Sequence, residues 1–357
     1  MDEDKSAKTL TKLLDVQYPI IQAPMAGTAT PELVAAVSNA GAIGSLAIGA
    51  ATVEQARNMI ARTRELTNRT FNVNVFCHQT PERDMKREAE WLEYLAPYFD
   101  EFGSEIPEEI EFIDSSILAN DAMLQMLLEE KPAIVSFHFG FPSAGAIQAL
   151  KSTGITTFAT ATSLEEARAI EAAGIDAIVA QGVEAGGHRG IFDTGADDQR
   201  LPTSVLVRTL VEKQDLPVIA AGGIMDGRSI QAVLNLGASA AQLGTAFVLC
   251  PESAANDVYR SVLKSDRASR TMHTTALTGR PARGIVNTLT ELGQDPSCPK
   301  PPEYPLATSV SRAISAVALQ AGSIEFGSYW AGQAAPLARE MPAGELVALL
   351  VQEMSEA

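Results

Sequence analysis

The chain has 357 residues, 46% of them hydrophobic, so it can bury a large core and suits one large domain with an insertion. Its 27 basic and 44 acidic side chains give a formal net charge of -17, which argues against nucleic acid or an anionic membrane as a partner. The three cysteines lie far apart without CxxC spacing, the amino terminus lacks an apolar signal core, and no apolar run is long enough to span a membrane. We therefore expect a cytoplasmic protein.

Short apolar runs, typical of buried strands, alternate with helical segments along most of the chain. Strands are expected at 19–23, 42–45, 71–76, 133–136, 155–159, 176–180, 217–220 and 239–242. Residues that cap helices, such as Thr30, Thr52, Ser163 and Asp226, open the segments between them, and Ser163 and Thr52 each have a Glu or Gln three residues on, as in a capping box.

Glycine ends four of these helices and leads directly into the next strand, at Gly41, Gly154, Gly174 and Gly237. Strands that alternate with helices in this way form a parallel sheet. Eight units within about 250 residues is the size of a (β/α)8 TIM barrel. The alternative is an open doubly wound sheet, but its usual G-x-G-x-x-G string is absent.

Two segments do not follow the alternation, and they divide the chain. Residues 1–78, 130–250 and 322–357 are assigned to the barrel, and 79–129 to a helical insertion whose aromatic residues we interpret as packing. Residues 251–321 mix helical stretches with Pro- and Gly-rich ones, among them Thr278-Gly279-Arg280-Pro281. A segment of this length is typical of a lid subdomain that covers the substrate.

Loops at the carboxyl ends of barrel strands meet at one mouth, so the residues there are candidates for a binding site. His188, directly after the Gly186-Gly187 pair, is the candidate catalytic residue. The candidate cofactor-binding residues are Ala23, Pro24, Met25, Asn74, His138, Gln181, Gly186, Gly187, Gly222, Gly223, Gln242, Gly244 and Thr245.

Two glycine-containing turns follow the last two barrel strands, where barrels commonly bind phosphate with backbone N–H groups and a helix N-terminus. Gly222-Gly223 and Gly244-Thr245 supply such donors, and no lysine or arginine adjoins them. Amide side chains at Asn74 and Gln181 suit the edge of an isoalloxazine ring, so flavin mononucleotide (FMN) is the expected cofactor.

Other classes of site lack support in the sequence. Four scattered histidines without paired carboxylates make a metal site improbable, and neither a G-x-S-x-G string nor a P-loop occurs.

Five strings together resemble one known family, the class I nitronate monooxygenases, formerly 2-nitropropane dioxygenases. They are Gln22-Ala23-Pro24-Met25-Ala26-Gly27, Asn72-Val73-Asn74, the run from Gln181 to Gly190, Ala221-Gly222-Gly223-Ile224 and Gln242-Leu243-Gly244-Thr245. The resemblance runs from about residue 15 to 250.

This resemblance implies an FMN enzyme that oxidises alkyl nitronates, such as propionate 3-nitronate, with O2 to carbonyl compounds and nitrite. It implies that His188 is the active-site histidine and that His138 lies near the flavin. Tyr259 and Tyr304 match substrate-pocket tyrosines, and Arg312 stands near where the family has a lysine. An unperturbed histidine titrates near pH 6.5, so His188 is expected to contribute one limb of the pH profile between about pH 6 and 8.

Two other functions remain open. The first is an enoyl-thioester reductase, with the same FMN barrel but reduced by NAD(P)H; a similar Gly-Gly-His string occurs in that group. The second is a protein that stores or senses FMN without turnover. The sequence also leaves a homodimer open.

Overall fold

The computed structural model describes residues 10–14, 16–112 and 115–357, so residues 1–9 of the expected barrel segment and 113–114 of the expected insertion lie outside it. Within that part, eight parallel strands form one sheet in the order β1-β9-β8-β6-β5-β4-β3-β2. The strands are β1 (Ile20–Gln22), β2 (Gly44–Ala47), β3 (Phe71–Phe76), β4 (Ile134–His138), β5 (Thr156–Ala161), β6 (Ala177–Gln181), β8 (Val218–Ala221) and β9 (Ala240–Leu243).

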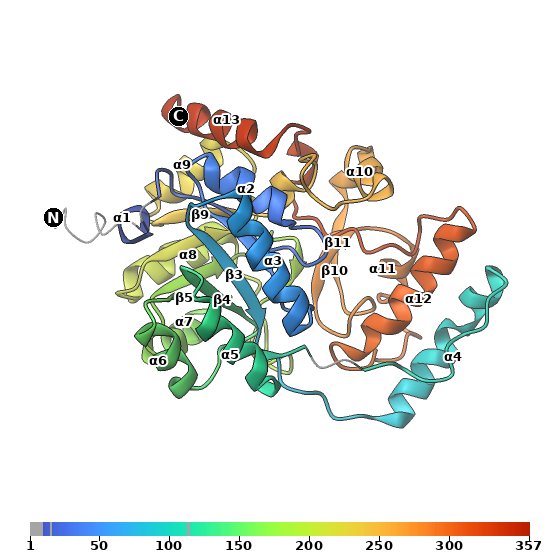
Figure 1. Ribbon diagram of the computed structural model, residues 1–357. Coiled ribbons are helices and arrows are strands. Elements are labelled where there is room, and N and C mark those ends of the chain that lie inside the picture. Colours follow the sequence, from blue (N-terminus) through green and yellow to red (C-terminus); the bar gives the residue numbers. More distant parts are fainter. Residues whose placement is uncertain (1–9, 15, 113–114) are drawn as a thin grey trace.

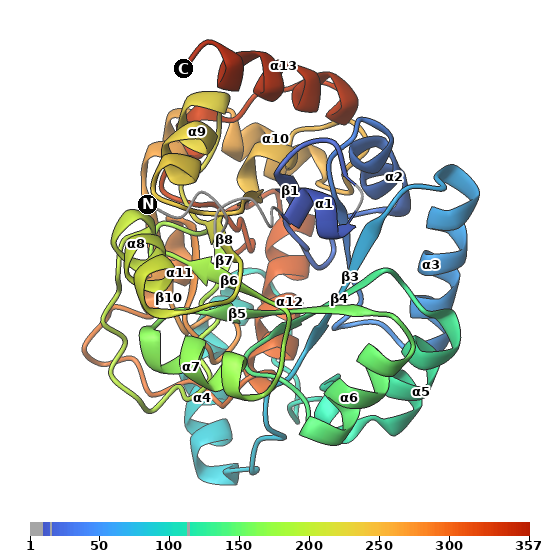
Figure 2. The same ribbon diagram turned by 90° about the vertical axis from the view of Figure 1, so that its left-hand side faces the viewer.

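The two ends of this sheet meet, because a parallel bridge joins Ile21 of β1 to Ile43 beside β2. The TIM barrel predicted from the sequence is thus confirmed, and the open doubly wound sheet is excluded. Figure 2 shows the strands ringed by helices. The helices that follow the strands are α2 (Pro31–Asn39), α3 (Val53–Leu66), α5 (Asp121–Glu130), α6 (Ala144–Ser152), α7 (Leu164–Ala172), α8 (Thr203–Lys213), α9 (Gly227–Asn235) and α13 (Ala343–Ser355).

The helix signals in the sequence act largely as predicted. Gly41, Gly154, Gly174 and Gly237 all adopt positive φ angles at helix ends, where a side chain would be strained. Thr52 and Gln55 form the predicted capping box. The one predicted at Ser163 is incomplete: Ser163 caps α7, but the Glu166 carboxylate instead accepts from Thr162 and from the Phe192 N–H, a donor that comes from a distant loop.

The core has an outer and an inner layer. Alternate strand residues, such as Val73 and Val75, pack outward against the ring of helices, while Asn72 and Asn74 of the same strand point into the barrel, where both reach Ser136. Helix α1 (Leu10–Leu14) adds two leucines to an inner apolar cluster that closes the amino end of the barrel (Figure 2). The carboxyl end is left for the site.

Two additions lie beyond the barrel at its carboxyl end. Helix α4 (Met85–Glu101) packs along α12 (Leu306–Gln320), as Figure 1 shows at the lower right. The aromatic residues of α4 are packing residues, since Trp91 and Phe99 join α12 in one buried cluster. Helix α5, which follows α4 in the segment 79–129, packs instead against α3 and α6.

The segment after β9 contains α10 (Asp257–Leu263), β10 (Thr271–Thr274), β11 (Ala282–Ile285), α11 (Thr288–Leu292) and α12. Short 3-10 turns follow β9 at Thr245–Phe247, Asp266–Ser269 and Ala335–Leu337, and a further one at Ile117–Ala119 precedes α5. Strands β10 and β11 pair antiparallel, and β11 pairs in turn with β7 (Gly187–His188). The Gly-Gly-His segment, expected as a loop, is therefore a strand of a three-stranded sheet shared with the segment 251–321.

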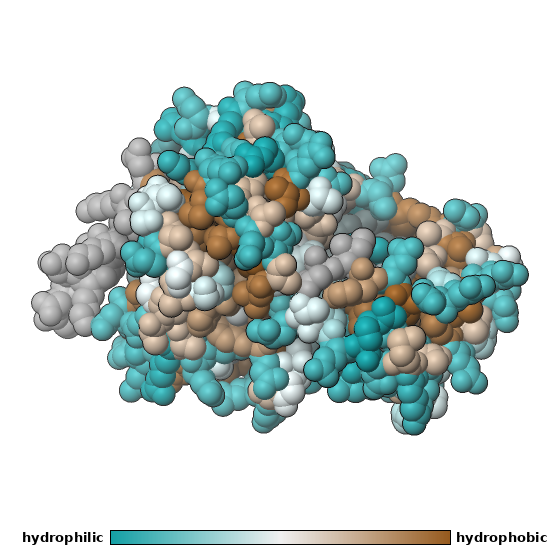
Figure 3. Space-filling view, turned by 60° about the horizontal axis from the view of Figure 1, so that its bottom comes forward, coloured by the Kyte–Doolittle hydropathy of each residue, from teal (hydrophilic) through white to brown (hydrophobic). Residues whose placement is uncertain are grey.

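The face of the molecule drawn in Figure 3 is mixed in hydropathy. On the face in Figure 3, hydrophobic areas are interspersed among hydrophilic side chains. No helix in the described ranges is both long and apolar enough to cross a bilayer.

Candidate active site

A cavity of about 1140 Å³ lies at the carboxyl end of the barrel strands, beneath the segment that carries α12. Its lining includes every residue that the sequence analysis placed in the site, from Ala23 on the first strand to Arg312 on α12. Side chains that are more than two hundred residues apart in sequence thus meet around one space. The volume is slightly above the usual upper value of about 1,000 Å³ for a small-molecule or cofactor site.

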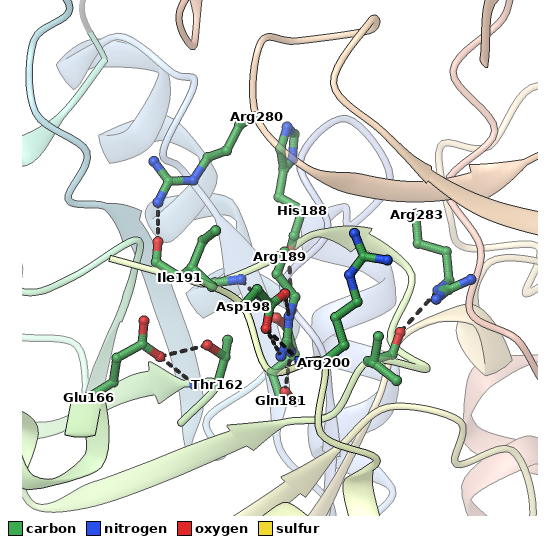
Figure 4. Close-up of polar contacts among 12 residues, drawn as sticks. Thr162, Glu166, Gln181, His188, Arg189, Ile191, Asp198, Arg200, Arg280 and Arg283 are labelled. Carbon is green, nitrogen blue, oxygen red and sulfur yellow. Dashed lines mark hydrogen bonds and ion pairs between the residues drawn. The ribbon is translucent and has the colours of Figure 1, made fainter. Parts of the chain in front are cut away.

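The backbone around His188 is held from several sides (Figure 4). The His188 carbonyl accepts from the Gln181 amide, at 3.0 Å, and lies 3.2 Å from Nε2 of His138. The Gln181 side-chain carbonyl accepts in turn from the Gly190 N–H at 2.8 Å. Arg189 turns inward and pairs with Asp198 at 2.9 Å. These contacts hold the His188 backbone in place.

His138 is neutral and carries its proton on Nε2. A carbonyl can only accept, so the ring nitrogen facing the His188 carbonyl must donate, and Nδ1 then accepts from the Thr160 hydroxyl at 3.0 Å. Burial lowers the pKa of His138 to about 4, although the bond to the His188 backbone opposes that shift. Both ring nitrogens are therefore already used by protein groups.

His188 itself lies among aromatic rings, with Tyr304, Trp330 and Phe139 at centroid distances of 5.3, 5.4 and 5.6 Å. Its Nε2 is 3.0 Å from the Thr278 hydroxyl, which donates to the Arg280 carbonyl and so accepts from His188. Nδ1 is then the nitrogen with the free lone pair.

The charge state of His188 differs from the one the sequence suggested. Burial is the largest cause that lowers the pKa of His188 to about 3, and His138, Arg280 and His78 each disfavour a proton on the ring further. The imidazole is neutral at physiological pH, so the limb expected between pH 6 and 8 does not come from His188. The reason is tertiary: folding buries the ring and brings Arg280 and two other histidines toward it, and no carboxylate opposes them among the described residues that shift it.

The glycine turns lie at the carboxyl ends of β8 and β9. Gly222 and Gly223 have φ angles of 121° and 70°, which L side chains rarely adopt. A Cβ on Gly222 would come within 2.8 Å of Thr203 Oγ1, whereas one on Gly244 would meet its nearest atom at 3.6 Å. Thr245 Oγ1 accepts from the Gly332 N–H at 3.0 Å, which leaves its own proton to donate. These turns and the wall beside them can hold a phosphate.

The helix that follows β8 does not contribute a free N-terminus, contrary to the common barrel arrangement. The Asp226 carboxylate accepts from the Ser229 N–H, and the Glu353 carboxylate accepts from the Gly227 N–H. Two acidic side chains thus accept hydrogen bonds from backbone N–H groups in the first turn of α9. Their negative charges would repel an anion there. Phosphate binding at this end would depend on the glycine turns and Thr245.

The Asn74 and Gln181 side-chain amides, expected to meet the flavin, already form hydrogen bonds within the protein. Asn74 donates to the Ser136 backbone carbonyl at 3.1 Å and to its hydroxyl at 2.9 Å. Gln181 holds the His188 segment, as described above. Gly186 has a packing role, because a Cβ there would lie 2.5 Å from the Gly332 nitrogen, whereas Gly187 faces open space. The third amide side chain of the predicted site, Gln242 near the end of β9, also lines the cavity.

Tyr259, Tyr304 and Arg312 reach the cavity from the segment after the barrel strands. The Tyr259 hydroxyl donates to the Trp330 carbonyl, so Tyr259 holds the wall of the site. Tyr304 packs edge-on against His188, and burial raises the pKa of its hydroxyl, which stays protonated. Arg312, an exposed residue of α12, also lines the cavity.

Four residues close to His188 were missed by sequence reasoning: Phe139, Thr278, Arg280 and Trp330. Thr278 and Arg280 belong to the Thr278-Gly279-Arg280-Pro281 string, which the sequence showed only as a Gly- and Pro-containing stretch. A hydroxyl and a buried cation in a turn carry no periodic signal, so their place beside His188 could not be predicted.

Comparison with known proteins identifies the family of this chain. The family model described as nitronate monooxygenase matches residues 7–353. A nitronate monooxygenase of Paraburkholderia phytofirmans is 52% identical over 356 residues, covering 100% of this chain and 97% of its own length.

Two solved structures are also similar. A nitroalkane oxidase from Streptomyces ansochromogenes has a TM-score of 0.89 at 41% identity, with 97% of this chain and 98% of the other covered. FabK from Thermotoga maritima has a TM-score of 0.73 at 29% identity, with 97% and 96% covered. The enoyl-thioester reductase alternative is not favoured. This family consists of flavin-dependent enzymes. The chain belongs to the nitronate monooxygenase family of oxidoreductases.

Proposed function

We propose that this protein oxidises alkyl nitronates, with propionate 3-nitronate as a representative substrate, and uses O2 to form a carbonyl compound and nitrite. The observation that carries the proposal is that His188 and the glycine turns after β8 and β9 line one cavity. Family membership supports oxidation of nitronates in general. The particular substrate and products are the proposed part.

We further propose that the flavin is FMN. The turns at Gly222-Gly223 and Gly244-Thr245 would hold its phosphate through backbone N–H groups and one hydroxyl. Asn74 and Gln242 line the cavity and would meet the ring edge, and Met25 would lie beside its face. When bound, FMN supplies the electron acceptor that passes reducing equivalents from the nitronate to O2.

The protein's own part is to bind and orient an anion. A neutral His188 presents a lone pair on Nδ1, which can remove a proton from a neutral nitroalkane or accept a hydrogen bond. The protonated Tyr304 hydroxyl can donate to the nitronate oxygens, and Arg312 is the cation available to a substrate carboxylate. The apolar rings around His188 exclude water from the reacting carbon.

Anaerobic mixing separates this function from its alternatives. Propionate 3-nitronate should change the flavin spectrum without O2, and NADH should do so negligibly. Admission of O2 should then restore the oxidised spectrum and release nitrite. Rapid bleaching by NADH together with an inert nitronate would instead identify a reductase, and inertness to both would indicate storage or sensing of flavin. The cytoplasmic location and a homodimer stay predictions for fractionation and light scattering.

A further inference from the structure

Arg280 is a buried cation directly behind the site. Its side chain extends from the Thr278–Pro281 turn, and the residue is 5% exposed. Its guanidinium carbon lies 4.2 Å from the centroid of the Phe139 ring. Phe139 in turn contacts His138, at a centroid distance of 4.5 Å, and His188, at 5.6 Å. One aromatic ring therefore separates this charge from both histidines.

The charge of Arg280 is not neutralised by contact. Its polar partners are the carbonyls of Ile191 and Phe192, and its Nε has no hydrogen-bond partner (Figure 4). No carboxylate in the described ranges forms an ion pair with it. The Glu166 carboxylate, also drawn in Figure 4, accepts hydrogen bonds from the Thr162 and Phe192 N–H groups instead. An unpaired buried cation is costly to a protein, and such a cost often marks a functional role.

The two other buried arginines near His188 contact the Gly-Gly-His segment and its surroundings directly. Arg189 pairs with Asp198, and Arg283 donates to the Val183 carbonyl and to Thr271 at the edge of the β10–β11 pair. These two residues hold the backbone of the Gly-Gly-His segment. Arg280 also donates to backbone carbonyls, but it differs from the other two in lying against the Phe139 ring, which contacts both His138 and His188.

Resting on the proposed function, we propose that Arg280 is a positioning residue that acts from behind Phe139: its charge makes the cavity favourable to a bound anion and adds to the groups that disfavour a proton on His188. A nitronate is anionic before it reacts, so both effects favour the same ligand. At this range a unit charge in a protein interior is worth about a tenfold effect on an equilibrium.

The groups that face His188 from all sides are consistent with this role. His138 on β4, His78 after β3 and Arg280 each disfavour a proton on His188, and burial adds to their effect. Tyr304 and Thr278 are neutral, and Thr278 accepts from His188 Nε2. Arg312 lines the same cavity as a further cation. Of the groups that disfavour the proton, Arg280 alone carries a permanent charge.

The test compares three variants of the flavin-loaded enzyme. Arg280→Gln removes the charge but keeps a donor for the Ile191 carbonyl, and Arg280→Lys keeps the charge. Arg270→Met is the matched control, because it removes a cation whose side chain is 74% exposed and therefore screened. The readouts are nitrate affinity by calorimetry and the protonation midpoint of His188 by imidazole NMR, assigned with His188→Asn.

We expect Arg280→Gln to bind nitrate about tenfold more weakly and to raise the His188 midpoint by about one pH unit. Arg280→Lys and Arg270→Met should stay near wild type. Unchanged affinity and midpoint in Arg280→Gln would overturn the proposal, as would a wild-type protein that binds no nitrate. Should Arg280→Gln not fold, Arg280→Met takes its place, with the same expected changes and the same overturning result. These readouts need no turnover, so an enzyme inert to nitronates would refute the proposed function alone.

Discussion

His188 is the residue at which the neutral charge state and the proposed chemistry can be tested together. Because its backbone is held by Gln181 and His138 and the glycine turns belong to other strand ends, His188→Asn should retain the flavin. It should lose roughly 10²–10⁴-fold in kcat/KM, the size of one general base or charge-stabilising group. Steady-state kinetics with flavin content measured in parallel decide this, and near-normal turnover would mean that His188 is structural.

The pH profile gives a second test at the residue scale. With a pKa of about 3, His188 stays deprotonated over the working range, so kcat/KM for an ionised nitronate should show no His188 limb between pH 6 and 8. The profiles of wild type and His188→Asn should then be parallel in that range. A limb present in the wild type and absent from the variant would show that His188 titrates normally.

Gly223 tests the phosphate end of the cavity. Gly223→Asp should lose FMN, because its carboxylate would repel the phosphate. Since φ is 70° and a Cβ would lie 3.2 Å from Glu184 Cβ, any side chain strains this turn. Gly223→Ala is therefore the control, and it should retain more FMN than the aspartate variant in flavin fluorescence after gel filtration. Recovery of FAD, or equal retention by both variants, would contradict this assignment.

At the scale of elements, α4 supports α12, and α12 carries Arg312 into the cavity. Trp91 of α4 is fully buried in their shared cluster, so Trp91→Ala should destabilise the fold by about 3–5 kcal/mol. Looser packing of α12 should raise KM for the nitronate more than it lowers the flavin content. Chemical denaturation and steady-state kinetics measure the two effects. Lys86→Ala, at a position 86% exposed on the same helix, should leave both unchanged.

The short strand β7 shows how elements far apart build one site. Gly187 and His188 pair with Ala282 and Arg283, nearly a hundred residues later. The segment 251–321 thus shapes the position of the histidine. A two-residue strand has no pattern of its own, so only the presence of its partner reveals it.

At the scale of the whole molecule, buried histidines predict a loss of stability in mild acid. The pKa values of His138, His188 and His273 are lowered by burial to about 4, 3 and 4. Below about pH 6.5 these histidines bind protons in the unfolded chain but stay neutral in the folded state. The free energy of unfolding is therefore highest above pH 6.5 and falls toward pH 4. Thermal unfolding against pH measures this, and His188→Asn should show a shallower fall. A wild-type curve flat from pH 7 to 4.5 would contradict it.

Much of the site followed from local sequence, because strand ends in a parallel barrel converge whatever their distance in the chain. Asn74, Gly223 and Thr245 could be placed at the cavity from their positions after buried strands alone. Their individual partners could not be predicted. The engagement of Gln181 with the His188 carbonyl and the capping of α9 by Glu353 depend on segments whose approach no local pattern records.

The amino-acid sequence by itself determined the barrel, its helix caps and the group of residues at its mouth, since periodicity, glycine stops and capping residues act over a few neighbouring positions. Only the tertiary structure decided that His188 is neutral, that His138 holds its backbone and that Arg280 stands unpaired behind them. Charge state and hydrogen-bond partners depend on burial and on groups brought together by folding, and these are properties of the assembled molecule.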